Sequence, residues 1–319
     1  MRIIFMGTPE FAVPSLEALL RSDDEVVGVV AQPDRPKGRG HALVPPPVKV
    51  VAQSAGKPVL QPTKMKDPAF LGAINEWRPD VIAVAAFGRI LPPAILSLPS
   101  QGCINVHGSL LPKYRGAAPI QWAIVNGEVE TGITTMLMDE GMDTGAMLLH
   151  EAIPIEPVDT SGTLSERLSQ VGARLLIETL TQLKAGRLKP ISQDHSQATT
   201  APIIKKEDGL IDWNLGARAI ANRVRGFNPW PTAYTYTGSD RWTIWQTVPL
   251  TETAKSNIPG TVVRSDKSGI VVQCGDGLLA VTSLQVPGGR RLTAGEYLAG
   301  HPVALGLRLG SPPVSTVVS

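Results

Sequence analysis

The sequence predicts two successive domains, a doubly wound α/β domain with a parallel sheet and then a smaller all-β barrel. The chain has 319 residues, and a domain usually takes roughly 100–200 residues. Its first half holds short apolar runs without alternation, separated by helical patterns, which is typical of a parallel sheet buried on both faces. Its last third holds short strand-like segments at close spacing, as in a small barrel. Hydrophobic residues make up 43% of the chain, enough for a core in each domain.

The first domain is predicted to start with a strand at Ile3–Met6, followed by the turn Gly7-Thr8-Pro9 and a helix. Thr8 is expected to cap that helix, with Pro9 at its first position. Later elements follow from apolar runs and helical spacing. In chain order they are a strand at Glu25–Ala31, a helix through Leu71, Ile74 and Trp77, strands at Val81–Ala86 and Cys103–Val106, and a helix at Thr163–Gln182.

A polar segment without periodicity, Pro190–Pro202, is expected to link domains that span residues 1–189 and 203–319. The second domain is predicted to have one helix, at Ala217–Val224, and then strands. Gly275-Asp276-Gly277 is a hairpin signal between two of these strands, and the stretch after Gly300 is expected to be a loose tail. The predicted strands are Arg241–Gln246, Gly260–Val263, Gly269–Cys274 and Leu278–Leu284.

Charge is distributed unevenly along the chain, although its formal net value is only +2. Through Pro202 there are 18 Lys and Arg against 20 Asp and Glu, a net of −2; from Ile203 onward there are 12 against 8, a net of +4. This difference favours a polyanionic partner for the second domain. The two cysteines, Cys103 and Cys274, fit neither a disulfide framework nor a zinc site. With no signal peptide and no long apolar span, we expect a cytoplasmic protein without a membrane partner. A monomer is the default expectation, because the sequence does not give the oligomeric state.

The first strand-to-helix turn argues against a dinucleotide-dependent oxidoreductase. Gly7-Thr8-Pro9-Glu10-Phe11 stands where such folds carry Gly-x-Gly-x-x-Gly, and the second and third glycines are missing. Thr8 and Pro9 would keep the backbone away from a pyrophosphate.

Asn105 and His107 are the first candidates for chemistry. Strand alternation puts both side chains on one side, at the carboxyl end of a predicted buried strand, where ligand sites form in open α/β sheets. An amide and an imidazole pointing together suit an oxyanion that develops on a carbonyl carbon. The alternative is a hydrogen-bonded structural histidine.

An acidic loop, Met138–Gly145, follows an apolar-alternating run, and its spacing fits no EF-hand. It is either a solvated turn or the source of a carboxylate for His107. Such a carboxylate would fix the imidazole tautomer and favour its charged form.

These segments together resemble the 10-formyltetrahydrofolate-dependent formyltransferases. The resemblance lies in Asn105-x-His107, the turn Ser109-Leu110-Leu111-Pro112 and Asp143-Thr144-Gly145. It extends over nearly the whole chain, and further motifs resemble the family members that act on methionyl-tRNA. These motifs are Gly7–Phe11, Gln32–Gly40, Arg115–Ile120 and Phe227–Pro231. The resemblance implies a Rossmann-like domain followed by an open barrel of the OB type.

The resemblance also implies a reaction and its residues. The formyl group of 10-formyltetrahydrofolate would pass to the α-amine of methionine on initiator methionyl-tRNA, without a metal. Asn105 and His107 would stabilise the oxyanion, and Asp143 would orient His107. The folate would contact Ser109, Leu110, Leu111 and Pro112, together with Phe87, Gly88, Arg89 and Ile90, and with Met138, Asp139, Glu140 and Gly141.

A basic stretch rich in Pro and Gly, Asp34–Pro47, has neither helical nor strand periodicity. Taken alone it could be a solvated loop, but the resemblance implies that it enters the tRNA acceptor end. It would then contribute Arg35, Lys37 and Arg39, with Arg39 at the first base pair. In the second domain the first candidates for RNA contact are Lys205 and Lys206.

Two alternatives remain open at this point. A small-amine formyltransferase or a 10-formyltetrahydrofolate hydrolase would share Asn105, His107 and Asp143 but would not need the basic loop. A non-catalytic RNA-binding protein would not need these three residues, so their presence together argues against it. Formyl-transfer assays with charged initiator tRNA and with small amines would separate these possibilities.

Overall fold

The computed structural model describes residues 1–37, 42–252 and 258–310, and the chain forms two compact units. The first unit contains Met1–Pro119, Glu130–Pro154 and Leu164–Pro202, and the second contains Ile120–Val129, Ile155–Thr163 and Ile203–Ser319. Residues 190–202, expected to be a linker, therefore belong to the first unit. Residues 120–129 and 155–163, expected in the first domain, belong to the second.

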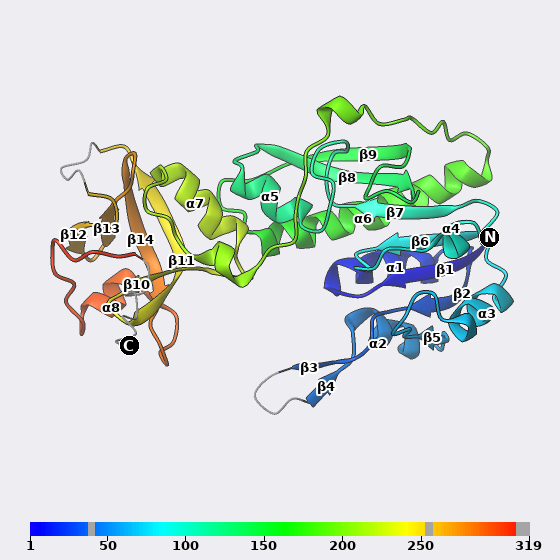
Figure 1. Ribbon diagram of the computed structural model, residues 1–319, viewed down its shortest axis with the longest axis horizontal. Coiled ribbons are helices and arrows are strands. Elements are labelled where there is room, and N and C mark those ends of the chain that lie inside the picture. Colours follow the sequence, from blue (N-terminus) through cyan, green and yellow to red (C-terminus); the bar gives the residue numbers. More distant parts are fainter. Residues whose placement is uncertain (38–41, 253–257, 311–319) are drawn as a thin grey trace, which may run out of the picture. The chain divides into compact units, whose positions relative to one another are not determined.

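A seven-stranded sheet forms the centre of the first unit, in the order β5-β2-β1-β6-β7-β8-β9. Its parallel part confirms the prediction and consists of β1 (Arg2–Gly7), β2 (Glu25–Val30), β5 (Val59–Leu60), β6 (Val81–Ala85) and β7 (Cys103–His107). The sheet is not purely parallel, however. Two antiparallel strands extend it, β8 (Glu130–Leu137) and β9 (Met147–Pro154), and the alternating run before the acidic loop forms β8 (Figure 1).

Most helices of the first unit begin beside a proline, but the long helix Ser161–Lys184 does not. They are η1 (Glu10–Ala12), α1 (Val13–Arg21), α2 (Pro47–Ser54), α3 (Pro68–Glu76) and α4 (Pro93–Leu96), with α6 (Ser161–Lys184) later in the chain. The expected Thr8 cap is wrong, because Pro9 precedes the first helical turn and α1 starts at Val13. The Thr8 hydroxyl instead donates to the Phe87 carbonyl (3.3 Å) and accepts from the backbone amide of Gln32 (3.4 Å).

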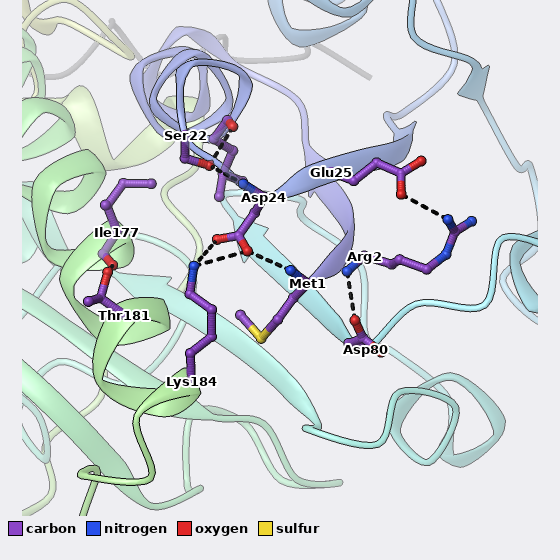
Figure 2. A network of polar contacts seen from close by, with 10 residues as sticks. Met1, Arg2, Ser22, Asp24, Glu25, Asp80, Ile177, Thr181 and Lys184 are labelled. Carbon is purple, nitrogen blue, oxygen red and sulfur yellow. Dashed lines mark hydrogen bonds and ion pairs between the residues drawn. The ribbon is translucent and has the colours of Figure 1, made fainter.

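A polar cluster joins α6 to the turn before β2 (Figure 2). The Lys184 Nζ atom lies 2.9 Å from Oδ2 of Asp24, a carboxylate with only 4% exposure that also accepts from the Met1 amine. Burial raises the pKa of Asp24, but hydrogen bonds from the Met1 amine and Lys184 outweigh it, so that the pKa lies below its ordinary value. The end of the long helix is thus fixed to the start of a central strand.

The basic stretch after β2 contains a short antiparallel pair of strands, β3 (Arg35–Lys37) and β4 (Ala42–Val44), where the sequence predicted none. Three residues per strand are too few for alternation to show in the sequence. Figure 1 shows this hairpin extending away from the sheet of its own unit.

The second unit confirms an antiparallel sheet, in the order β10-β11-β14-β13-β12, with β15 beside β14. The strands are β10 (Ala233–Thr237), β11 (Asp240–Leu250), β12 (Val262–Asp266), β13 (Gly269–Gln273), β14 (Leu278–Gln285) and β15 (Leu292–Thr293). The sequence missed β10, which pairs with β11 in a hairpin. The helical elements are α5 (Pro119–Val125), η3 (Lys206–Gly209), α7 (Ala217–Gly226) and α8 (Ala294–Leu298), and α7 buries Ile220 and Val224 in the core.

Residues 306–310 hydrogen-bond to both edges of this sheet and so correct the expected loose tail. On one edge the Val262 amide donates to the Leu307 carbonyl, and the Gly306 amide donates to the Val262 carbonyl (both 2.8 Å). On the other, the Tyr236 and Gly310 amides donate to each other's carbonyls at 2.9 and 3.0 Å. We call this segment, Gly306–Gly310, the closing segment, because it partly closes the sheet into the expected open barrel.

Candidate active site

The carboxyl end of β7 carries the Asn105 and His107 side chains. Asn105 is half-buried and opposite Val84 of β6 and Met136 of β8, while His107 is 5% exposed. In a strand, the side chains of residues i and i+2 lie on the same face of the sheet. The Asn105 side chain makes no hydrogen bond to another residue of the described part, so its amide is available to a ligand.

The two nitrogens of the His107 ring lie near two oxygen atoms. Nε2 lies 2.9 Å from the Tyr114 carbonyl oxygen, and Nδ1 lies 3.7 Å from Oδ2 of Asp143. A carbonyl only accepts, so Nε2 must carry a proton. The 3.7 Å between Nδ1 and the carboxylate exceeds hydrogen-bond length, so these two atoms do not form a hydrogen bond with each other in this structure.

Asp143 reaches His107 from a loop with unusual backbone geometry. Its φ is +54°, in the left-handed region that residues other than Gly seldom adopt. Its Oδ2 atom accepts from the Gly116 amide at 2.8 Å, and its own carbonyl accepts from the Gln193 side chain at 2.8 Å. The structure thus brings His107 and Asp143 together, as the sequence predicted, and two further segments hold Asp143, one at its carboxylate and one at its backbone carbonyl.

The turn Ser109–Pro112 is held by Thr134 of the neighbouring strand β8. The Thr134 hydroxyl donates to the Ser109 carbonyl at 2.7 Å and accepts from the Leu111 amide at 3.1 Å. The Ser109 side chain is fully buried and donates to the Lys113 carbonyl at 2.6 Å. The Ser109 hydroxyl is therefore committed within the turn, and a ligand would meet backbone atoms, Leu110 and Pro112.

The loop after β6 places Phe87 inside and its neighbours outside. Phe87 is buried, Gly88 and Arg89 are exposed, and the side chain of Ile90 is 77% exposed. Gly88 has a φ of +74°, and a Cβ there would lie 2.7 Å from the Gln32 side chain. Gln32 donates to the Phe87 carbonyl at 2.8 Å, which ties this loop to the end of β2.

The loop after β8 is organised by Asp139, whose Oδ1 accepts from the Gly141 amide (3.0 Å) and from Thr144 (2.7 Å). Glu140 and Gly141 are exposed, and Met138 packs against the core cluster that contains Phe87. Two of the predicted folate segments therefore share one hydrophobic cluster.

A hollow of 420 Å³ lies at the carboxyl ends of β1 and β2, beside Ala86. Most of its wall is proline and other apolar side chains: Pro9, Pro33, Pro36, Val44, Pro45, Pro46 and Pro47, with Thr8, Gln32 and Arg35.

The candidate RNA-binding residues are distributed over both units. Arg35 is exposed on β3 and donates to the Gln32 side chain. Lys37 belongs to the same strand, and its side chain lies outside the described residues, as does all of Arg39. Lys205 and Lys206 are exposed at the start of η3, in the second unit.

Three residues of the site were missed by the sequence analysis: Thr134, Gln32 and Gln193. All three are polar side chains that hydrogen-bond to backbone groups of remote segments. Gln193 is 5% exposed, yet it stands in a polar segment where sequence patterns indicate solvent. A buried amide there leaves no sequence signal.

Within the described ranges, no helix is long and apolar enough to cross a membrane. Nor do those ranges contain a group of three or more His, Cys, Asp or Glu side chains that could hold a metal ion.

Comparison with known proteins gives a consistent result. Residues 1–180 match the formyl transferase family model, and residues 203–302 match that of the formyl transferase C-terminal domain. The chain is 51% identical over 310 residues to a methionyl-tRNA formyltransferase of Geobacter sulfurreducens (97% of each chain), and 51% identical over 318 residues to one of Citrifermentans bemidjiense (100% and 99%). An N-formyltransferase of Helicobacter canadensis, solved with folinic acid and dTDP-3-aminofucose, has a similar fold: TM-score 0.66 at 18% identity, covering 88% of this chain and 98% of the other.

Proposed function

The chain belongs to the formyl transferase family, and on that premise we propose that it transfers the formyl group of 10-formyltetrahydrofolate to the α-amine of methionine on initiator methionyl-tRNA. The observation that carries this proposal is the His107–Asp143 pair at the carboxyl end of β7, in a chain 51% identical over nearly its whole length to methionyl-tRNA formyltransferases.

The reaction requires that the two substrates be held together, that the negative charge on the carbonyl oxygen be stabilised and that a proton be transferred. The α-amine nitrogen attacks the formyl carbon, the carbonyl oxygen takes up negative charge, and the bond from that carbon to N10 of the folate then breaks. An α-amine titrates near pH ~7.7–8.0, so a useful neutral fraction exists without a strong base. The amine loses one proton and the departing N10 gains one.

Asn105 and His107 are proposed to stabilise the oxyanion. The Asn105 amide is uncommitted within the described residues, and Nδ1 of His107 lies 3.7 Å from Oδ2 of Asp143, beyond hydrogen-bond length. Both groups are therefore proposed to donate to the oxyanion. Asp143 is proposed to orient His107 and to receive or pass a proton through water.

The folate is proposed to contact the Ser109–Pro112 turn and the loops Phe87–Ile90 and Met138–Gly141. Large apolar side chains stand exposed in or beside these loops, Ile90 at 77% and Met142 at 64%. A flat aromatic ring would cover such side chains. Tetrahydrofolate supplies the activated formyl group, and the protein supplies the surface that orients it.

The tRNA is proposed to contact Arg35, Lys37 and Arg39 in the first unit and Lys205 and Lys206 in the second. We propose that the two units correspond to a catalytic domain and a tRNA-binding domain. The part of the second unit from Ile203 onward carries a net charge of +4, which supports contact between this part and the tRNA. The protein is proposed to act as a monomer in the cytoplasm, where aminoacyl-tRNA is used.

The test is a formyl-transfer assay with purified protein and 10-formyltetrahydrofolate. Initiator methionyl-tRNA, elongator methionyl-tRNA, free methionine and water would be offered as acceptors. We expect rapid formylation of the initiator alone. Transfer mainly to free amines or to water would support a small-amine transferase or a hydrolase, and tRNA binding without transfer would contradict the proposed activity.

A further inference from the structure

The segment 190–202 lies against the catalytic residues of its own unit. Gln193 is a buried polar residue of this segment, with 5% exposure. Its amide nitrogen Nε2 donates to two carbonyl oxygens of one loop, those of Asp143 and Gly145, each at 2.8 Å. A single side chain therefore fixes the backbone on both sides of Thr144.

The amide oxygen of Gln193 has a second task. Oε1 accepts from Nε and one terminal nitrogen of Arg115, at 2.9 and 2.7 Å. Arg115 directly precedes Gly116, whose amide donates to the Asp143 carboxylate. Gln193 thus connects the two loops that meet at this carboxylate, one through each end of its amide.

Main-chain pairing places the same segment beside Gly116. The Arg115 amide donates to the Thr199 carbonyl (2.9 Å), and the Ala201 amide donates to the Arg115 carbonyl (2.7 Å). Gly116 has a φ of +122°, and a Cβ there would lie 2.6 Å from the Ala201 carbonyl oxygen. The close approach of this segment therefore requires glycine at position 116.

From these contacts we propose that Gln193 is a positioning residue for the formyl transfer, acting by holding the Asp143 carboxylate beside His107. This inference rests on the proposed role of Asp143. The Asp143 backbone occupies the left-handed region, which costs free energy and persists only where surrounding contacts impose it. The two donations from Gln193 are such contacts.

The two ends of the amide allow the proposal to be tested cleanly. Gln193→Glu keeps an acceptor for Arg115 but replaces the donor with an oxygen that repels the Asp143 and Gly145 carbonyls. Gln193→Met keeps the length of the side chain but removes both the amide donor and the amide acceptor. If Gln193 acts through Asp143, both variants should lower kcat by roughly 10–100-fold, the scale of a small misplacement of a reacting group, with little change in KM for either substrate.

A double-mutant cycle separates this role from a general loss of structure. In an Asp143→Asn background, Gln193→Glu should cause little further loss of kcat, because the group that it positions is already disabled. Gln197→Ala, in the same segment and exposed, is the matched control and should behave as wild type. Circular dichroism and thermal unfolding would confirm that each variant is folded.

Three results would overturn the inference. Gln193→Glu could retain wild-type kcat, which would mean that the contact with Arg115, and not the donation to the Asp143 loop, is what matters for turnover. The loss could fall on KM, which would indicate substrate binding. The effects of Gln193→Glu and Asp143→Asn could simply multiply, which would make them independent. A wild-type protein without transfer activity would instead contradict the proposed function, so the two failures are distinguishable.

Discussion

Two regions of the first unit, the end of β7 and the β3–β4 hairpin, are constructed in opposite ways. At the end of β7, His107 and Ser109 are 5% and 0% exposed, and side chains from remote segments fix the loops. In the hairpin, Leu43 is 67% exposed and Arg35 is exposed. The hairpin is held at its base, where Lys49 contacts both Asp34 carboxylate oxygens at 2.9 Å and Gln61 at 2.8 Å.

The difference fits two tasks. Group transfer between small moieties requires donors that are fixed before the substrate arrives. Contact with a large polyanion requires basic groups that extend from the body of the protein. We therefore expect mutations at the end of β7 to act on kcat and mutations at the hairpin to act on the use of tRNA.

The largest expected effect is that of Asp143→Asn, which keeps the size of the side chain and an acceptor for the Gly116 amide but removes the charge beside His107. We expect kcat to fall by roughly 10²–10⁴-fold, the range for a proton-transfer group, with the fold intact. Single-turnover formylation of initiator methionyl-tRNA measures it. Near-normal turnover by a folded variant would remove Asp143 from the mechanism.

The next effect concerns Arg39, which lies outside the described residues. If its planar guanidinium contacts the end of the acceptor stem through two hydrogen bonds, Arg39→Lys should fail nearly as badly as Arg39→Ala. The expected loss of preference for initiator over elongator methionyl-tRNA is roughly 1–3 kcal/mol, the scale of a bidentate base contact. The measurement is kcat/KM for both tRNAs. Unchanged preference in both variants would show that the hairpin does not select the tRNA.

A smaller effect is expected at the base of the hairpin. Hydrogen bonds from Gln61 and Lys49 hold the pKa of Asp34 below its ordinary value. Lys49→Met should raise that pKa and increase KM for methionyl-tRNA by roughly two- to fivefold, the scale of an exposed ion pair, with kcat almost unchanged. NMR titration and steady-state kinetics measure the two effects. The control is Lys64→Met, at an exposed lysine. An equal effect in both variants would argue against a role of Lys49 in holding the base of the hairpin.

The smallest effect concerns the thiols. Burial raises the pKa of Cys103, on β7, and that of Cys274, in the second unit, each to about 12. At pH 8 both should stay unreacted toward a disulfide reagent in the native protein and react fully in denaturant. Rapid labelling of Cys103, the first residue of β7, in the native state would mean that this strand opens, which would weaken the contrast between the two regions.

The sequence was sufficient for the elements whose signal is local. Buried strands such as Ile3–Met6, the long helix near Thr163–Gln182 and the glycine turn before β14 all appear where they were expected. The position of Asn105 and His107 at a strand end follows from alternation alone, and the pairing of Asp143 with His107 was expected from the motif.

The remaining features depend on contacts between distant residues. β10 and the β3–β4 hairpin are too short or too polar for a clear period. The segment 190–202 has the composition of a linker, yet Thr199 and Ala201 pair with Arg115. Main-chain pairing of this kind is almost independent of side-chain type, so composition cannot reveal it.

The closing segment has a consequence for the synthesis of the chain. It joins both edges of the sheet, and Gly310 is made 77 residues after Ala233, the first residue of β10. At roughly 5–20 residues per second this delay lasts about 4–15 s, whereas a hairpin such as β10–β11 forms within about 1–10 μs. During those seconds the outer edge of β10 has only the earlier segment Leu210–Ile211 beside Tyr234 to cover it, and exposed edges can pair with other chains. The pairing that joins both edges of this sheet therefore cannot form before Gly310 has been added.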